Sequence, residues 1–266
     1  RPRRLDGGGY YRLQDMVVDA LIDRYFGERP IYFSVTVGAG ARTYRGQPID
    51  SRLTVSGMLF RVEEPHGGVI VDIPESLDFF ANKFRARSIA DPDVYMDEAT
   101  ERMTRNYGNA FLMIADTLRK AGDLKTAEKL IRAGWQAVPH AGDLPEYLAS
   151  IYEQQGRVDD LRRLADTVHY GDTNWIKTLL GRAQANQGDT AAARATLESV
   201  IRSSGNYRRA LDELMRLQFS ARDIEGMRRS LQLWLEFNPD DQQVKSALRE
   251  LRAGINFDSL NRGSAQ

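Results

Sequence analysis

Cysteine is absent from the 266 residues, so disulfides, thiol catalysis and cysteine-ligated metals are all excluded. This absence leaves the compartment open, because disulfide-free proteins occur on both sides of a membrane. Net charge is also absent, since 37 Lys and Arg residues balance 37 Asp and Glu residues. The balance removes any global electrostatic case for nucleic acid or for an anionic membrane surface.

Long apolar runs are missing as well. No stretch approaches the ~18–20 apolar residues that a membrane helix needs, and no secretory signal peptide is visible. With 42% hydrophobic and 28% charged residues the composition is globular, and the length suits one large domain or two ordinary ones. The chain begins at Arg1 and not at Met, which favours a fragment or a processed product.

The usual patterns of catalytic and cofactor sites are missing. His66, His140 and His169 lie far apart without ligand spacing, so we expect turn or surface histidines and not a zinc site or a triad. Gly38-Ala39-Gly40 lacks the third glycine and the following helix of a nucleotide-binding loop, and no Walker pattern is present. We therefore assign no catalytic, cofactor-binding or metal-binding residue and expect no cofactor.

The densest acidic cluster lies just before the helical half of the chain and consists of Asp91, Asp93, Asp97 and Glu98. It lacks the glycine and the terminal glutamate of a calcium loop at the right spacing. Acids are favoured at a helix N-terminus by the helix dipole, so helix capping is the preferred interpretation. Asp91-Pro92-Asp93 in particular predicts the start of a helix, with an acidic cap and proline in the first turn.

A repeat organises the second half. Four turn sequences are separated by 34, 32 and 34 residues, namely Gly122-Asp123, Gly156-Arg157, Gly188-Asp189 and Arg222-Asp223. Tetratricopeptide repeats, which are helix–turn–helix units, have a period of about 34 residues. A large aliphatic residue lies eight positions before each turn, in the order Ile114, Leu148, Leu180 and Leu214. Apolar spacing of three and four after each turn predicts a second helix.

Two residues refine this prediction. Pro139 and Pro239 each lie 17 residues after a turn, where a second helix should stop. Arg222 breaks the glycine rule, so the last hairpin turn is expected to differ in detail. The sequence thus predicts a mainly α protein, with an α-solenoid of about four tetratricopeptide-like hairpins. Three arginine pairs in these helices are interpreted as solvated faces: Arg162-Arg163, Arg208-Arg209 and Arg228-Arg229.

The first third has a different pattern. A helix is predicted over Tyr10–Phe26 and closed by Gly27, with one side formed by Leu13, Met16, Val17, Ala20, Leu21 and Tyr25. Strands are predicted at Ile31–Val37, Met58–Val62 and Val69–Ile73, with a glycine-rich loop over Gly38–Asp50 and a helix or turn at Leu77–Phe84. Most aromatic residues here should be core, while a few exposed ones can face a membrane surface or a partner.

These observations predict four segments. Residues 1–9 form a linker, residues 10–96 a small α+β cap domain, residues 97–254 the repeat domain and residues 255–266 a flexible tail.

Several blocks of the front half are distinctive when taken in order: Asp19–Asp23, Arg29–Thr36, Gly57–Val62, Asp91–Glu98, Arg102-Met103 and Asn106-Tyr107. Over roughly residues 13–140 they resemble the soluble C-terminal region of a family of large bacterial membrane proteins. The N-terminal part of that family resembles GT-C glycosyltransferases of the protein O-mannosyltransferase kind, and its tails often end in tetratricopeptide repeats. The chain departs from the pattern in a reshaped loop at Gly38–Asp50 and in the missing membrane part.

The resemblance implies a tail outside the cytoplasm, on the periplasmic side, with the transfer chemistry in the missing membrane part. Our first hypothesis is a non-catalytic protein–protein interaction module, either the tail of such a protein or derived from one. Its expected partners are proteins, namely subunits of membrane proteins, and neither nucleic acid nor a small-molecule substrate is expected. In a solenoid the first helices line the binding groove, which points to Tyr147, Tyr152, Gln154, Asn174, Trp175 and Lys177.

Two alternatives remain open. The chain is an accessory scaffold subunit of a larger membrane complex, such as an energy-transducing one. Or it is a carbohydrate-active enzyme that uses Asp91, Asp93 or Asp97.

Overall fold

The computed structural model describes residues 3–4, 10–91, 93–141, 143–168 and 171–253. The chain forms two compact units, residues 1–148 and 149–266, which we describe separately. The division falls within a helix of the repeat region. The segment boundaries predicted from sequence stay predictions, and the predicted tail and most of the predicted linker lie outside the described residues.

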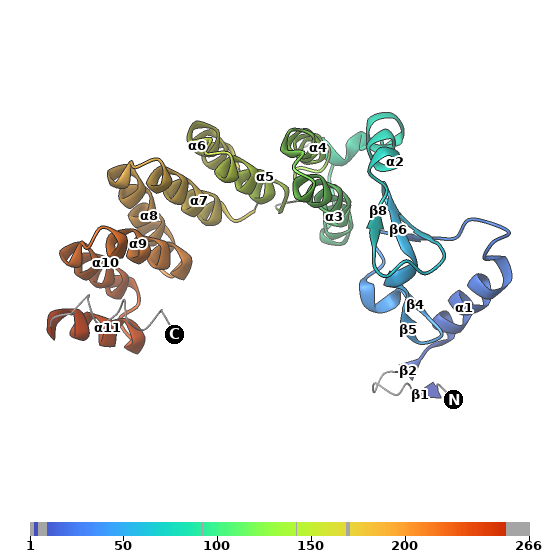
Figure 1. Ribbon diagram of the computed structural model, residues 1–266, viewed down its shortest axis with the longest axis horizontal. Coiled ribbons are helices and arrows are strands. Elements are labelled where there is room, and N and C mark those ends of the chain that lie inside the picture. The colour runs from blue at the N-terminus through green and yellow to red at the C-terminus, as the bar shows by residue number, and fades with distance from the viewer. Residues whose placement is uncertain (1–2, 5–9, 92, 142, 169–170, 254–266) are drawn as a thin grey trace. The chain divides into compact units, whose positions relative to one another are not determined.

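The first unit contains a four-stranded sheet (Figure 1). Its strands lie in the order β3 (Tyr32–Ser34), β7 (Leu59–Val62), β6 (Leu53–Ser56) and β8 (Ile70–Val71). β7 is antiparallel to both neighbours, and β6 pairs with β8 in parallel. The predicted strands are present in shorter form, but β6 is an additional strand that the sequence patterns did not indicate. All four of its residues are buried, and Leu53 and Val55 are fully so.

Short elements surround this sheet. Two further strand pairs are antiparallel: β1 (Arg3–Arg4) with β2 (Tyr10–Tyr11), and β4 (Thr43–Tyr44) with β5 (Gln47–Pro48). Helix α1 spans Leu13–Tyr25, and Gly27 follows it with a positive φ of 87°. The short helices are η1 (Ala39–Ala41), η2 (Asp50–Arg52), α2 (Ile73–Asp78), the π-helix η3 (Phe79–Lys83) and η4 (Arg87–Ala90).

Helix α1 turns its polar side inward. Asp15, Asp19 and Ile22 are buried, whereas all the residues predicted to share one side face solvent except Tyr25, which is half-buried. Leu13 is 77% exposed and Met16 53%. Hydrogen bonds explain the orientation, because the Asp19 carboxylate accepts from the Arg45 backbone N–H at 2.8 Å and from the Tyr11 hydroxyl.

The first helix of the repeat region begins later than the helix start predicted at Asp91–Asp93. Helix α3 spans Glu98–Lys120, and its N-cap is Asp97, whose carboxylate accepts from the Thr100 backbone N–H at 2.7 Å. The expected start at Asp91–Asp93 is therefore wrong. The Asp91 carboxylate instead accepts from the Asp93 backbone N–H within a turn. The interpretation of the acidic cluster as a helix N-terminus is thus correct for Asp97, the N-cap, and for Glu98, in the first turn.

Helices then alternate as hairpins: α3 with α4 (Leu124–Ala137), α5 (Asp143–Gln154) with α6 (Val158–Thr167), α7 (Thr173–Asn186) with α8 (Thr190–Ser204), and α9 (Arg208–Ser220) with α10 (Ile224–Phe237), followed by α11 (Gln242–Ala253). In the second unit α7 also packs on α9, and α8 on α10 (Figure 1). Leu197, Leu211, Leu231 and Val244 belong to one continuous core there. The mainly α fold with a small N-terminal α+β region is confirmed.

The four hairpin turns share one geometry. Gly122, Gly156, Gly188 and Arg222 all have positive φ, from 55° to 87°. In each turn the next backbone N–H donates to the carbonyl five residues earlier, as from Asp223 to Gln218 at 2.9 Å. The expectation that the turn at Arg222 differs is wrong, because the arginine adopts the left-handed conformation itself. Asp123, Asp189 and Asp223 then cap the second helices.

Substitutions at these turns measure how much the positive φ of the turn residue contributes to the free energy of unfolding. We expect Arg222→Gly to raise the free energy of unfolding by about 1 kcal/mol, because glycine adopts positive φ without strain. Gly122→Ala and Gly188→Ala should each lower it by about 1–2 kcal/mol. An added Cβ meets nothing within 4 Å at either glycine, so no clash contributes. Thermal unfolding measures these changes. Gly38→Ala is the control, because Gly38 has φ −61° and open space around it.

Candidate interaction surface

The six residues predicted to bind a partner lie on α5 and α7. On α5, the Tyr147 hydroxyl is 3.1 Å from Arg119 Nε and 3.3 Å from Asp116 Oδ1, which ties α5 to α3. Burial of its ring raises the pKa of Tyr147. Tyr152 is only 2% exposed, and the Arg157 guanidinium lies 4.4 Å from its ring centroid. Gln154 is exposed at the end of the helix.

On α7, Asn174, Trp175 and Lys177 are half-buried near the start of the helix. The Arg209 guanidinium lies 5.0 Å from the Trp175 ring centroid and joins α9 to α7. This contact gives Arg209 a role that its interpretation as a solvated arginine does not include. Arg162 and Arg163 do pair with acids on their own helix, as that interpretation requires.

The first helices of the second unit are also joined at their N-terminal ends. The Tyr207 hydroxyl donates to Asp172 Oδ2 at 2.8 Å, and burial together with this bond raises the pKa of Tyr207 to about 12. Asp241 accepts from Arg208 at 3.0 Å and from Trp234 Nε1 at 2.9 Å, which links α9 and α10 to the start of α11. These bonds fix the spacing of α7, α9 and α11.

A cavity of about 190 Å³ opens between the C-terminal ends of α7 and α9. Its lining consists of Gly181, Arg182, Ala185, Asn186, Leu197, Glu213, Arg216, Leu217 and Ser220. A Cβ on Gly181 would lie 2.8 Å from Leu197 Cγ, so glycine allows the close approach of α7 and α8 beneath the cavity. We call this cavity and its rim the α7–α9 groove.

Charges of both signs line the α7–α9 groove. Arg182 lies between Glu153 Oε1 at 2.7 Å and Glu213 Oε1 at 3.5 Å, and the bond to Glu153 is the main cause that raises the pKa of Arg182. Arg216 pairs with Glu213 at 2.5 Å, yet its side chain stays 59% exposed. An accessible guanidinium therefore lies beside a small cavity.

Sequence reasoning missed these groove residues, although a pattern for them exists. Arg182 and Arg216 both lie six residues before a hairpin turn, where the other two repeats have Asp116 and Ser150. Polar residues thus recur two positions after the buried aliphatic residue of each first helix. The repeated position identifies residues on the exposed face of the first helices. Our prediction had selected aromatic and amide side chains by residue type and not by this position.

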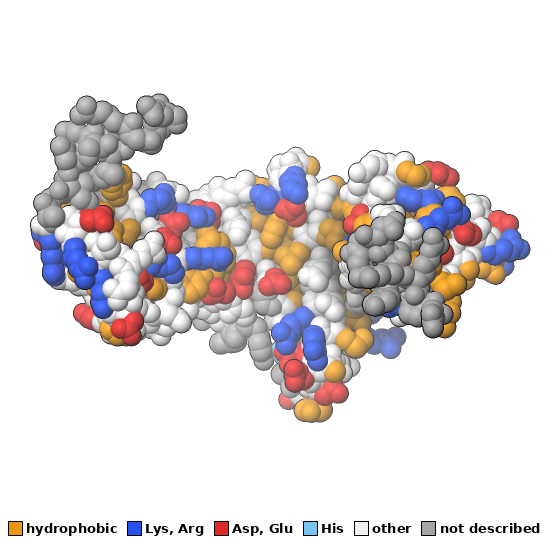
Figure 2. All heavy atoms as spheres, turned by 90° about the horizontal axis from the view of Figure 1, so that it is seen from below, with side chains coloured by type: hydrophobic (Ala, Val, Ile, Leu, Met, Phe, Trp, Pro, Cys, Tyr) orange, Lys and Arg blue, Asp and Glu red, His pale blue; other side chains and the backbone are white. Residues whose placement is uncertain are grey.

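Charged side chains of both signs are mixed on the molecular surface. On the face shown in Figure 2, Lys and Arg side chains alternate with Asp and Glu, and no large area of one sign is visible. This agrees with the zero net charge, and local arrangements therefore matter more than the total charge.

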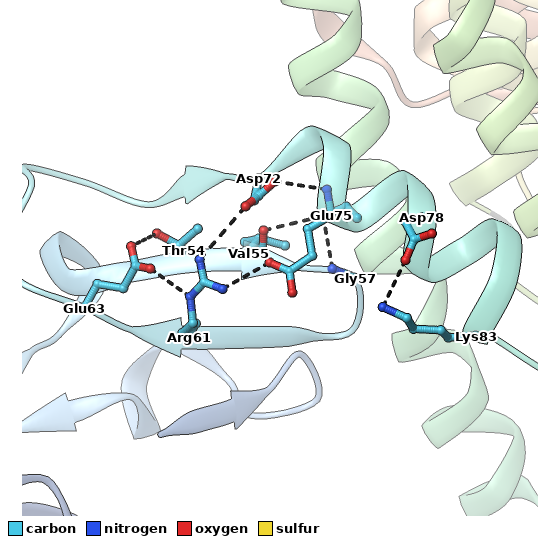
Figure 3. A network of polar contacts seen from close by, with 10 residues as sticks. Thr54, Val55, Gly57, Arg61, Glu63, Asp72, Glu75, Asp78 and Lys83 are labelled. Carbon is cyan, nitrogen blue, oxygen red and sulfur yellow. Dashed lines mark hydrogen bonds and ion pairs between the residues drawn. The ribbon is translucent and has the colours of Figure 1, made fainter. Parts of the chain in front are cut away.

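A polar network joins the sheet to α2 in the first unit (Figure 3). Arg61 Nε lies 2.8 Å from Glu63 Oε1, its Nη1 3.1 Å from Glu75 Oε2 and its Nη2 3.9 Å from Asp72 Oδ2. Thr54 donates to Glu63, and this bond, followed by those from Arg61, lowers the pKa of the Glu63 carboxyl. The Arg61 guanidinium pairs with these three carboxylates and occupies the space where a metal ion would bind. The network therefore holds α2 on the sheet.

The acids of the enzyme alternative do not converge. Asp97 caps α3 and Asp91 closes a local turn, while the bonds from Thr100 lower the pKa of Asp97. A general acid needs a raised pKa, so this carboxyl is poorly suited to that role. Among the described residues, no group of three or more His, Cys, Asp or Glu side chains is placed to hold a metal ion.

Two of the three histidines are described. His66 lies in the loop between β7 and β8, and both of its ring nitrogens are buried without a hydrogen-bond partner in the described chain. His140 follows α4, and His169 lies outside the described residues. Within the part of the chain that the structure describes, no helix is both long enough and apolar enough to cross a membrane.

Comparison with known proteins gives no assignment: no protein-family profile matches the chain, and no curated protein matches it significantly.

Proposed function

We propose that the chain is a non-catalytic protein–protein interaction module that binds a partner polypeptide in the α7–α9 groove. The observation that carries the proposal is the groove itself, built from first helices of consecutive hairpins. Helical repeat arrays bind partners on the continuous surface that such helices form. The 34-residue spacing and the resemblance to tetratricopeptide repeats support the same function.

The groove suggests the chemistry of the partner. Its cavity accepts a small apolar side chain, and the exposed Arg216 attracts an acidic group beside it. The flanking Glu153 and Glu213 disfavour a second acid at their positions, so a segment of alternating character fits best. Such charge arrangements set specificity and register more than affinity.

A second candidate function is that of an accessory scaffold subunit on the extracytoplasmic side of a bacterial membrane. The exposed apolar side of α1 favours it, because Leu13, Met16, Val17 and Leu21 are 49–77% exposed on one side of a single helix. Apolar patches of a few hundred Å² are typical of interaction sites. The resemblance to membrane glycosyltransferase tails supports this location and implies membrane-protein subunits as partners.

One experiment separates the two candidates. The native protein is isolated from its own membranes in mild detergent, and co-purifying proteins are quantified by mass spectrometry for the wild type and two variants. Arg216→Glu reverses the exposed groove charge, with Arg194→Glu on α8 as the matched control. A Leu13→Ser, Val17→Ser double variant makes the α1 side polar without touching buried residues.

The groove function predicts that Arg216→Glu lowers partner recovery at least tenfold, while Arg194→Glu leaves it unchanged. If only the α1 variant loses its partners, the scaffold function is correct and the groove is not the site. Unchanged recovery in every variant refutes both. Hydrolase or transferase activity of the isolated, metal-replete chain would contradict the non-catalytic proposal.

A further inference from the structure

An aromatic cavity lies in the first unit, between the segment after α2 and the hairpin of α3 and α4. Its volume is about 400 Å³, within the range of about 300–1,000 Å³ that is typical of ligand sites. Three rings form one wall. Phe80 lies 4.1 Å and Phe84 5.6 Å from Phe111, measured between ring centroids.

Small residues on α4 create the space opposite these rings. Ala133 and Ala137 line the cavity one helical turn apart. Between them, Gly134 lets Phe111 approach α4, since a Cβ there would lie 2.6 Å from the ring. Phe111 is 1% exposed and firmly packed, whereas Phe80 and Phe84 are only half-buried. The cavity is thus open on one side and rigid on the other.

Two arginines stand at the rim. Arg85 and Arg87 both line the cavity, and neither forms an ion pair with a described residue. The Arg85 guanidinium donates to the carbonyls of Phe84 at 2.8 Å and Asn82 at 2.9 Å, which fixes its position. Their charges are therefore uncompensated beside an apolar interior, an arrangement complementary to an apolar group with an anionic end.

The backbone around the cavity is irregular in two places. Phe79–Lys83 form a π-helix, a form that is rare and frequent at functional sites. Arg87 has φ +46°, a strained conformation for a residue with a side chain. Strain of this kind clusters at binding and catalytic sites. Both irregularities present cavity residues, namely Phe80 on the π-helix and Arg87 at the rim.

We propose that this cavity binds the carboxyl terminus of a partner polypeptide whose last residue is aromatic or branched aliphatic. The side chain fills the space between the phenylalanines and α4, and the terminal carboxylate pairs with Arg87 beside Arg85. Bidentate pairing with carboxylates is a property of arginine. The cavity has a volume of about 400 Å³ and a wall of aromatic rings, which suits one bulky side chain. The site uses residues separate from the α7–α9 groove, so it is independent of the proposed function.

The test uses the full chain and three defined probes. N-acetyl-Gly-Gly-Phe with a free carboxylate is compared with its C-terminal amide and with decanoate, by calorimetry and by ligand-observed NMR. Ala133→Trp fills the cavity from an exposed position. Arg87→Asn removes one of the two rim charges with a residue that tolerates positive φ. The melting temperature of each variant confirms that it folds.

The proposal predicts that the peptide acid binds at least tenfold more tightly than its amide. Ala133→Trp should lower affinity for the acid at least tenfold without lowering the melting temperature. Arg87→Asn should lower the affinity for the acid several-fold, toward that of the amide, and leave amide binding unchanged. Equal binding of acid and amide, or no binding at the highest soluble concentration, overturns the proposal. Tighter binding of decanoate than of the peptide acid assigns the cavity to fatty acids instead.

Discussion

Gly57→Ala is expected to lower the free energy of unfolding by about 3 kcal/mol, combining left-handed backbone strain with overpacking. Gly57 joins β6 to β7 with φ +59°, where a side chain is strained whatever the space around it. A Cβ would also lie 2.4 Å from Cδ1 of Phe79 and 3.0 Å from its Cβ. Rotation of the ring cannot relieve the second contact.

The turn also holds α2 on the sheet. The Gly57 backbone N–H donates to Ser76 Oγ at 3.0 Å, and Ser76 is fully buried. Displacing Gly57 therefore disturbs α2 and the π-helix that follows, which carries the wall of the aromatic cavity. We expect the variant to lose probe binding at the cavity together with stability.

Chemical denaturation followed by circular dichroism measures the loss, and Gly38→Ala provides a control with an open, unstrained position. Adding Phe79→Ala to Gly57→Ala removes Cγ and Cδ1, the two atoms nearest to the new Cβ, but keeps the strained φ. A double-mutant cycle then separates the clash from the strain. A loss below about 1 kcal/mol for Gly57→Ala shows that the turn can rearrange, which contradicts the prediction.

The repeat half was predictable because it states the same pattern four times. Each turn has its glycine or arginine, its aliphatic residue eight positions earlier and, in two repeats, a proline 17 positions later. One deviation, Arg222, does not obscure such a pattern. The pattern does not tell whether an arginine can adopt the positive φ of the glycines. The prediction that the turn at Arg222 differs was therefore wrong.

The front third shows the limits of periodicity. Spacing identifies which residues of α1 share a side but not which side is buried. In α1, the hydrogen bonds that Asp19 accepts bury its polar side and leave most of the apolar residues exposed. β6 escaped prediction because it is only four residues long, too short for the alternation of Leu53 and Val55 with Thr54 and Ser56 to stand out. Its two polar residues are buried nevertheless, and Thr54 donates to Glu63.

The candidate sites follow the same rule. The six residues predicted for partner binding lie on the intended first helices, but Tyr152 is packed in the core. The α7–α9 groove depends on Arg182, which meets Glu153 and Glu213 across three helices. Such ion pairs join residues about 30 positions apart, and no local pattern predicts them. Their partner function stays a prediction.

Ser230→Ala is expected to lower the free energy of unfolding by about 2 kcal/mol, the typical cost of a buried polar group without a partner. Gln218 Nε2 donates to Ser230 Oγ at 2.8 Å between α9 and α10. Gln218 is 3% and Ser230 1% exposed. Gln218 Oε1 has no partner among the described residues, so the bond to Ser230 is important to this amide.

The repeat supplies the compensating change. The two positions correspond to Gln184 and Thr196 in the preceding hairpin, which are also hydrogen bonded, at 2.9 Å. The first hairpin has an apolar pair instead, Leu118 with Leu130, and the second has Tyr152 with Leu164. Apolar pairs are therefore compatible with this site. Replacing both partners of a buried hydrogen bond by apolar groups can be nearly neutral.

We expect the Gln218→Leu, Ser230→Ala double variant to recover most of the stability lost by Ser230→Ala, as measured by denaturant unfolding in a double-mutant cycle. If the single and double variants lose the same free energy of unfolding, the prediction is contradicted. In that case the unpaired Gln218 amide is not the cause of the destabilisation by Ser230→Ala.

Recovery of stability by the double variant would show that an apolar pair stabilises the packing of α9 on α10 as well as the polar pair does. The advantage of the polar pair would then lie in its directionality. A hydrogen bond holds one register of the two helices, whereas apolar contacts tolerate small shifts. The α7–α9 groove depends on the position of α9, so the double variant should keep its stability while hydrogen exchange along α9 becomes faster.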